Sequence, residues 1–181
     1  MGDNWMSKKD MTEEDIKLRF ITPSITKAQW SISDITMETQ VMFTDGKISL
    51  QGNCPHREKP KKADYLLYMS PWNPIAVVEA KDNNHLPSYG LQQAKKYAQM
   101  LDVPFAYSSN GDSFVEFDFL TGVERNIPMD AFPTKEELVA RYKAGANGGA
   151  GLSEAEINAS EQPYYTSDKT WPPRYYQRVA V

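Results

Sequence analysis

The chain has 181 residues, a length that allows one medium-sized domain with a short extension. Hydrophobic residues make up 40% and charged residues 24% of it, which are ordinary values for a globular protein and exclude a disordered or collagen-like chain. The 20 Lys and Arg against 24 Asp and Glu give a formal net charge of −4. This balance excludes a uniformly basic nucleic-acid coat, but it allows a local basic patch beside an acidic site.

The cysteine content and the hydropathy pattern bear on the cellular location. Cys54 is the only cysteine, so no disulfide can form within the chain and a cysteine-based zinc site would lack most of its ligands. No window approaches the roughly 18 apolar residues needed to cross a bilayer, and residues 1–10 lack the apolar middle of a secretory signal. We therefore expect a cytoplasmic protein with no membrane partner.

The first elements in chain order are a helix and a hairpin. Thr12 followed by three acidic residues is a typical helix start, and the apolar positions after it predict a helix to about residue 23. Further on, β-branched and aromatic residues flank a turn with Asp45-Gly46, a pair that favours positive φ. They predict a hairpin with arms at 41–43 and 47–50.

The middle of the chain predicts an alternation of strands and helices. The apolar runs 64–69 and 75–81, joined by a turn-rich connection, indicate two adjacent central strands. An apolar stripe predicts a helix ending near residue 101, and strands at 103–108 and 113–120 follow it. After these comes a helix over 134–143. This order predicts an α/β fold with a mixed central β-sheet flanked by helices.

The composition changes after residue 143. Four of the ten glycines lie within residues 144–151, which indicates a flexible linker over 144–162. Residues 163–181 are rich in Tyr, Trp and Pro but have too few aliphatic residues for a core of their own, so we expect them to dock on something else. The sequence therefore predicts one main domain over residues 1–143.

The most informative chemical pattern lies on the two central strands. Asp64 begins the first strand, while Glu79 and Lys81 end the second, so a hairpin brings them close together. Two carboxylates with the backbone carbonyl of Ala80 are hard oxygen ligands of the kind Mg²⁺ accepts. Lys81 would then orient an attacking water or neutralise charge on a phosphate. The alternative is an ordinary surface ion pair with Asp64 as a strand cap.

Two polar residues of the following helix extend this pattern. Gln93 and Tyr97 are four residues apart and fall on the flank of the apolar stripe, so both can face the sheet edge that carries Lys81. The alternative is boundary packing, with Tyr97 covering the core margin.

A short basic cluster precedes the first acid of the pattern. It suits a polyanionic substrate, because phosphate contacts supply most non-specific affinity for nucleic acids. The alternative is a solvated loop that keeps the protein soluble. Its members are Arg57, Lys59, Lys61 and Lys62.

At this point the chain resembles a known family, the N-terminal nuclease domain of the restriction (R) subunit of type I restriction-modification enzymes. The resemblance runs in order from about residue 12 to the end of the chain. Its motifs are the stretches 62–68, 75–81, 90–98, 108–111 and 132–138.

The resemblance implies the restriction-endonuclease-like PD-(D/E)XK fold and Mg²⁺-dependent cutting of double-stranded DNA. Asp64 and Glu79 match the metal acids, Lys81 matches the lysine, and Gln93 with Tyr97 matches a Gln-x-x-x-Tyr motif. Ala63 stands where the motif's name has Pro, a departure that touches no ligand.

The resemblance also implies features at the two ends of the chain. The family carries an acid on its first helix, which is Glu13 or Glu14 here, and Glu13 aligns better. Residues 163–181 resemble the entry into a helicase motor, and Gln177 stands in a motif that contacts adenine. Residues 173–177 carry that motif, but the chain has no phosphate-binding Gly-x-x-x-x-Gly-Lys-Ser/Thr segment, so ATP would bind only through a motor outside it.

The whole complex implied by the resemblance has further partners. These are double-stranded DNA and the modification (M) and specificity (S) subunits, with ATP-driven translocation in the full-length protein. A second reading keeps the fold without the chemistry, as a non-catalytic DNA-binding or subunit-docking module. The acidic net charge and the shortness of the basic patch motivate that second reading, whereas the complete set of Asp, Glu-x-Lys and Gln-x-x-x-Tyr motifs favours the nuclease.

Overall fold

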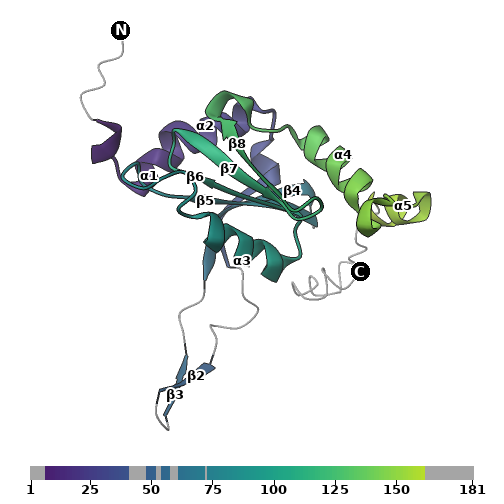
Figure 1. Ribbon diagram of the computed structural model, residues 1–181, viewed down its shortest axis with the longest axis horizontal. Helices are drawn as coiled ribbons and strands as arrows, with labels where there is room; N and C mark the ends of the chain where they lie inside the picture. Colours follow the sequence, from purple (N-terminus) through teal and green to yellow (C-terminus); the bar gives the residue numbers. More distant parts are fainter. Residues whose placement is uncertain (1–6, 41–47, 52–53, 58–60, 72, 162–181) are drawn as a thin grey trace, which may run out of the picture.

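The computed structural model describes residues 7–40, 48–51, 54–57, 61–71 and 73–161 (Figure 1). Within this part of the chain, six strands form one mixed sheet in the order β1-β4-β5-β6-β7-β8. They are β1 (Ile35–Gln40), β4 (Lys62–Ser70), β5 (Asn73–Ala80), β6 (Phe105–Ser109), β7 (Ser113–Asp118) and β8 (Val123–Pro128). Two further strands, β2 (Ile48–Gln51) and β3 (Cys54–Arg57), pair with each other in a separate antiparallel sheet.

The strand pairing places the start of β4 beside the end of β5. These two strands form an antiparallel pair in which Tyr65 lies opposite Val78. The pair β5 and β6 is parallel, with Glu79 opposite Ser108, and all other neighbours in the six-stranded sheet are antiparallel. A parallel pair needs a crossover connection, which helix α3 (Leu91–Leu101) supplies. The expectation of a mixed central sheet flanked by helices is confirmed.

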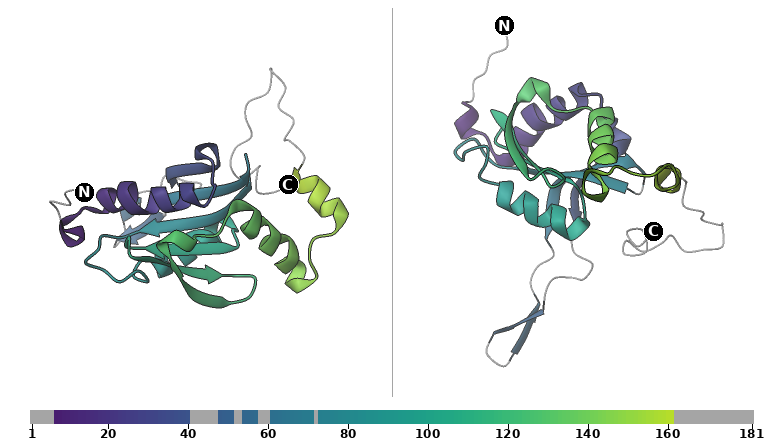
Figure 2. Two further views of the ribbon diagram at one scale, coloured as in Figure 1. Left: turned by 90° about the horizontal axis from the view of Figure 1, so that it is seen from above. Right: turned by 45° about the vertical axis from the view of Figure 1, so that its right-hand side comes forward.

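Helices cover both faces of this sheet (Figure 2). On one face, α1 (Glu13–Ile16), a π-helical turn (Lys17–Ile21) and α2 (Thr22–Lys27) follow one another without a break, and α4 (Lys135–Gly145) lies on the same face. Helix α3 covers the opposite face. Helix α5 (Glu154–Glu161) follows α4.

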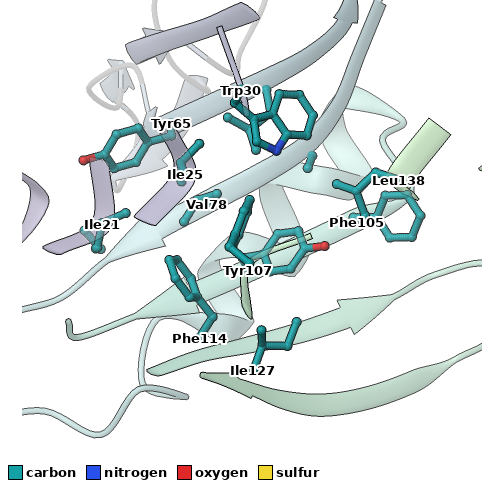
Figure 3. Packing of buried hydrophobic residues seen from close by; sticks show 14 of the residues in the cluster. Ile21, Ile25, Trp30, Tyr65, Val78, Phe105, Tyr107, Phe114, Ile127 and Leu138 are labelled. Carbon is teal, nitrogen blue, oxygen red and sulfur yellow. The ribbon is translucent and has the colours of Figure 1, made fainter. Parts of the chain in front are cut away.

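Alternating strand residues build a separate core on each face. Residues of one parity, such as Val78 and Tyr107, pack with Ile21 and Ile25 of the N-terminal helical segment (Figure 3). Residues of the other parity pack with α3 in a second cluster, which contains Leu66, Val77, Ala94, Ala98, Leu101 and Ala106. Because both faces are covered, the central strands are apolar throughout, which made them conspicuous in the sequence.

A buried charged network connects α4 to strand β7, near the edge of the sheet that lies opposite β1. Glu116 on β7 is fully buried and accepts hydrogen bonds from Arg141 at 2.7 and 3.0 Å and from Arg125 at 2.7 Å. Arg141 also donates to Asp118 at 2.8 Å and lies over the Phe105 ring. Burial acts to raise the pKa of Glu116, but the two arginines together hold it below its ordinary value.

Most of the predicted elements are present. The first helix begins after Thr12, whose side chain and that of Asp15 form a capping box, and it continues to Lys27, a few residues past the predicted end. The predicted helix over 134–143 is α4, capped by Thr134. The central strands and α3 also agree with the prediction.

The remaining elements differ from the prediction, were not predicted, or lie outside the described residues. The first arm and the turn of the expected hairpin, residues 41–47, lie outside them, and β2 pairs with residues 54–57. Strand β8 was not expected, because its only buried residue is Ile127 and it shows no apolar alternation. Helix α5 lies within the stretch whose glycines indicated a linker, and the domain boundary at residue 143 stays a prediction. No helix in the described part of the chain has the length and apolarity that a membrane span needs.

Candidate active site

The residues predicted to carry the chemistry meet where the start of β4 and the end of β5 approach the N-terminal helical segment. Asp64 and Glu79 are both buried, at 7% and 3% exposure. Asp64 contacts Lys17 of the N-terminal helical segment, and Glu79, its neighbour across the strand pair, contacts Gln93 of α3. The site is therefore built where the two helical layers meet at one end of the central strands.

Two fixed groups orient the Asp64 carboxylate. Its Oδ2 accepts a hydrogen bond of 2.8 Å from the backbone N–H of Ala80, so the hairpin register itself places this carboxylate beside the end of β5. Its Oδ1 lies 2.6 Å from the Nζ of Lys17, a residue of the π-helical turn. Each oxygen of an ionised carboxylate can accept two bonds, so both keep capacity for a further ligand.

Glu79 combines deep burial with one oxygen that lacks a hydrogen-bond partner among the described residues. Its Oε1 accepts hydrogen bonds from Gln93 Nε2 at 2.7 Å and from Lys81 Nζ at 3.3 Å. Its Oε2 is buried and has no hydrogen-bond partner among the described residues. Burial, and next the charge of neighbouring Asp64, raises the pKa of Glu79 to about 8. A buried carboxylate oxygen without a partner is costly, and a bound cation would relieve that cost.

Lys81 is held against the same group of oxygens. Its backbone N–H continues the parallel ladder by donating to Ser109 O at 2.9 Å. Its Nζ donates to the Ala80 carbonyl at 2.7 Å and lies 3.8 Å from Glu13 Oε2. The ammonium therefore lies among the carbonyl and carboxylate oxygens that the sequence assigned to a metal.

Gln93 and Tyr97 brace Glu79 from α3. Gln93 Nε2 lies 3.0 Å from the Tyr97 hydroxyl as well as 2.7 Å from Glu79 Oε1, and Tyr97 itself is 5% exposed within the core cluster under α3. Burial raises the pKa of Tyr97. Gln93 thus contacts Glu79 directly, whereas Tyr97 holds Gln93 and is at the same time part of the packing.

The backbone of Gly90 lies close to the side chains of Ser108, Glu79 and Lys81. The Gly90 N–H donates to the buried Ser108 Oγ at 3.1 Å. A Cβ at this position would lie 2.7 Å from Ser108 Oγ, 3.2 Å from Glu79 Cγ and 3.4 Å from Lys81 Cε. Only glycine fits here without displacing the Ser108 hydroxyl, and a Cβ would also crowd the Glu79 side chain.

These residues suit a magnesium ion. Asp64, Glu79 and the Ala80 carbonyl supply hard oxygen ligands, and the unpartnered Glu79 Oε2 is the atom that a cation would satisfy. No three Asp, Glu, His or Cys side chains gather into a metal-holding group anywhere in the described residues. The donor set is thus two carboxylates and a carbonyl, which leaves positions for water and a phosphate.

Glu13 of the first helix faces the lysines of the site. It lies 3.7 Å from Lys17 Nζ and 3.8 Å from Lys81 Nζ. Burial is the largest cause that raises its pKa, the charge of Lys81 opposes this, and Asp64 adds to it. A role of Glu13 as a metal ligand remains a prediction.

The other predicted residues lie farther away or outside the described part of the chain. Lys61 is half-buried and Lys62 is exposed at the start of β4, two positions before Asp64. Arg57 is the last residue of β3, and its side chain is not among those described. Lys59 and Gln177 lie outside the described residues.

Sequence reasoning missed three residues of the site. Lys17 lies on a helix and belongs to no recognised motif. It follows the acidic residues that indicated the start of the helix, so it drew no separate attention. Gly90 precedes α3 and Ser108 lies on a buried strand, and neither type signals a close approach by itself. The available signal was indirect, since a lysine at an inward position of an amphipathic helix requires a buried counter-charge.

The fold and the site define an α/β domain with a mixed six-stranded sheet and a buried acid–lysine site at one end of its central strands. Residues 12–133 match the family described as type I restriction enzyme R protein N terminus (HSDR_N). The chain belongs to this family.

Two relatives extend the comparison. The chain is 34% identical over 180 residues to the type I restriction enzyme EcoAI endonuclease subunit of Escherichia coli, a match that covers 97% of this chain and 22% of that protein. Its fold is similar to a solved fragment assigned to an HsdR subunit of a type I restriction enzyme from Vibrio vulnificus YJ016. That match has a TM-score of 0.77 and 36% identity, and it covers 94% of this chain and 31% of the other. The chain therefore spans about a fifth to a third of the relatives it matches.

Proposed function

We propose that this chain is a Mg²⁺-dependent endonuclease domain that hydrolyses phosphodiester bonds of double-stranded DNA. The observation that carries the proposal is the convergence of two buried carboxylates with Lys81, in which Glu79 Oε2 has no partner among the described residues. A purely structural ion pair would satisfy both oxygens of a buried carboxylate. The membership of the type I restriction R protein family supports the same activity.

Asp64, Glu79 and the Ala80 carbonyl would hold the Mg²⁺. When bound there, Mg²⁺ would supply Lewis-acid stabilisation of phosphate charge and would lower the pKa of water. Asp64 is suited to this role because Ala80 N–H and Lys17 fix its carboxylate before any ligand arrives. Gln93 fixes Glu79 in the same way from α3.

Lys81 has two tasks in the proposed reaction. Its Nζ lies 2.7 Å from the Ala80 carbonyl and 3.3 Å from Glu79 Oε1, beside two of the proposed metal ligands. From there it can orient a water for in-line attack on the phosphorus. The same positive charge stabilises the negative charge that builds on the phosphate oxygens in the transition state. As the water oxygen bonds to phosphorus, the P–O bond to the leaving sugar oxygen breaks and that oxygen takes a proton from solvent, while the proton released by the attacking water goes to solvent or to a phosphate oxygen.

The DNA contacts of the proposed domain are non-specific. Lys61 and Lys62 lie at the start of β4 on the approach to Asp64, and Arg57 and Lys59 belong to the same basic stretch of the sequence. Lysines and arginines of this kind contact the phosphate backbone and carry no sequence information. We expect the recognition sequence to be read elsewhere in the assembly.

We also infer that the chain is the N-terminal region of a longer R subunit. It covers 22% of the E. coli relative, and residues 163–181 resemble the entry into a motor domain, with Gln177 as an adenine contact. ATP-driven DNA translocation would then come from that motor. The M and S subunits would be partners of the complete protein.

Cleavage of supercoiled plasmid by the assembled restriction complex tests this function. We expect Glu79→Ala and Lys81→Ala to abolish Mg²⁺-dependent cleavage in complexes that still assemble and still hydrolyse ATP. Glu124→Ala at an exposed position and Lys135→Ala at the half-buried start of α4, where Lys135 pairs with Asp34, are matched controls and should cleave normally. Unchanged cleavage by both site variants would refute the assignment and favour a non-catalytic docking module.

A further inference from the structure

Lys17 is a buried lysine that the sequence pattern did not include and that takes no direct part in the proposed chemistry beyond holding Asp64. Its side chain is 2% exposed, and its Nζ lies 2.6 Å from Asp64 Oδ1. Three further carboxylates surround the same ammonium: Glu14 at 2.8 Å, Glu38 at 3.1 Å and Glu13 at 3.7 Å. Four acids thus share one cation, and Asp64 is the most buried of them.

The local backbone is shaped to put this ammonium in place. Lys17 begins the π-helical turn, and such turns widen a helix by one residue and are frequent at functional sites. Opposite it on β1, Glu38 has a positive φ of 52°, a left-handed conformation that is strained for a non-glycine residue. One irregularity therefore falls at the residue that carries this ammonium and the other at a residue that binds it.

The position of the ammonium relative to Asp64 decides what the other side of this carboxylate can bind. Lys17 Nζ approaches Oδ1 from the N-terminal helical segment, whereas Oδ2 accepts the hydrogen bond from the Ala80 N–H at the end of β5, next to Glu79. Glu13, Glu14 and Glu38 are the further acids around this ammonium, and with it in place the described residues hold no group of three acids arranged for a second cation. The lysine already occupies the space between them.

We propose that Lys17 is a positioning residue that acts as a fixed, protein-borne cation beside Asp64, so that the site takes a single divalent cation on its Glu79 side. This inference rests on the proposed function, because it concerns the metal that the nuclease reaction needs. A second ion would have to displace an ammonium that four carboxylates hold. The same ammonium repels the single ion through Asp64 and keeps its affinity moderate.

The stoichiometry of Mn²⁺ binding to this chain tests the proposal without any activity assay. Calorimetry should give one ion per wild-type chain, and electron paramagnetic resonance should show an isolated Mn²⁺ signal without coupling between two ions. A stoichiometry of two with a coupled signal would overturn the role of Lys17 but leave the nuclease proposal standing. No binding at all would contradict the nuclease proposal itself.

Substitution of Lys17 separates a charge effect from a packing effect. Lys17→Met removes the repulsion, so Mn²⁺ should bind at least about tenfold more tightly, while Lys17→Arg should keep the wild-type affinity. Lys8→Met removes another lysine near the chain start, one that pairs with Asp112 at 2.8 Å, and should change nothing. Unchanged or weaker binding by Lys17→Met would overturn the proposal. The wild-type stoichiometry decides the matter independently if that variant fails to fold.

Discussion

Replacing Glu79 by Gln should abolish cleavage and yet stabilise the metal-free protein. Glu79 is 3% exposed, and burial together with the charge of Asp64 raises its pKa to about 8. The uncharged amide keeps the shape of the side chain and can still accept the hydrogen bond from Gln93. The NH₂ group of the glutamine can face the Asp64 carboxylate. In the wild type a Glu79 oxygen is there instead, and the charge of Asp64 repels it.

The sign and the size of the effect follow from the two pKa values. Between the ordinary value of 4.5 and about 8, folded Glu79 holds a proton that the unfolded chain has lost. The free energy of unfolding of the wild type therefore falls as the pH rises through this window, whereas the variant has no such group. At about 1.4 kcal/mol per pH unit the whole difference is about 5 kcal/mol. Because the charges of Asp64 and Lys81 act on Glu79 in opposite directions, we expect only part of this difference, about 2 to 4 kcal/mol.

Urea denaturation in the presence of a chelator measures this difference. At pH 9 the Glu79→Gln variant should be more stable than the wild type by about 2 to 4 kcal/mol, and the difference should vanish toward pH 4.5. Glu124→Gln, a matched change at an exposed position, should show no such pH dependence. A variant that is less stable than the wild type at pH 9 would refute the reasoning, because it would mean that the charged carboxylate is stabilised in the folded state.

Three other perturbations test the surroundings of the site. Gly90→Ala puts a Cβ 2.7 Å from Ser108 Oγ, so cleavage should fall at least about tenfold and the free energy of unfolding should fall by about 1 to 3 kcal/mol. Partial rescue of cleavage by adding Ser108→Ala would identify this clash as the cause, and unchanged cleavage by Gly90→Ala would contradict it. Arg141→Met removes a main partner of buried Glu116 and should lower the free energy of unfolding by about 2 to 4 kcal/mol in urea denaturation, with part regained by adding Glu116→Gln. Mg²⁺ at 100 times its Kd should stabilise the wild type by about 2.7 kcal/mol, and a thermal shift that persists in Asp64→Asn would place the ion elsewhere.

The parts of the fold that sequence reasoning predicted are those with a strong local signal. The apolar runs of β4 and β5 stand out because both faces of these strands are buried, and Thr12 begins the first helix because it caps it. Their adjacency then brings Asp64 beside the end of β5, as the Ala80 hydrogen bond shows. The candidate site was therefore visible as soon as the two strands were assigned to one hairpin.

The parts that it missed depend on contacts between distant segments. Lys17 reaches Asp64 across 47 positions of the chain, which is apparent only once the helix lies on the sheet. The widening of the helix at Lys17 and the left-handed φ of Glu38 have no local sequence signal, since neither is a glycine or follows a proline. Strand β8 is mostly exposed and forms by pairing with β7, so its own residues carry no strand pattern.

A crystal structure of the chain soaked with Mn²⁺ tests the central claim most directly, because the anomalous signal of the ion locates it without reference to activity. We predict one peak, in contact with the carboxylates of Asp64 and Glu79 and the carbonyl of Ala80, and its loss in the Glu79→Gln variant. A peak elsewhere, or none at Mn²⁺ concentrations that support cleavage by the assembled complex, would contradict the assignment of this site as the nuclease centre.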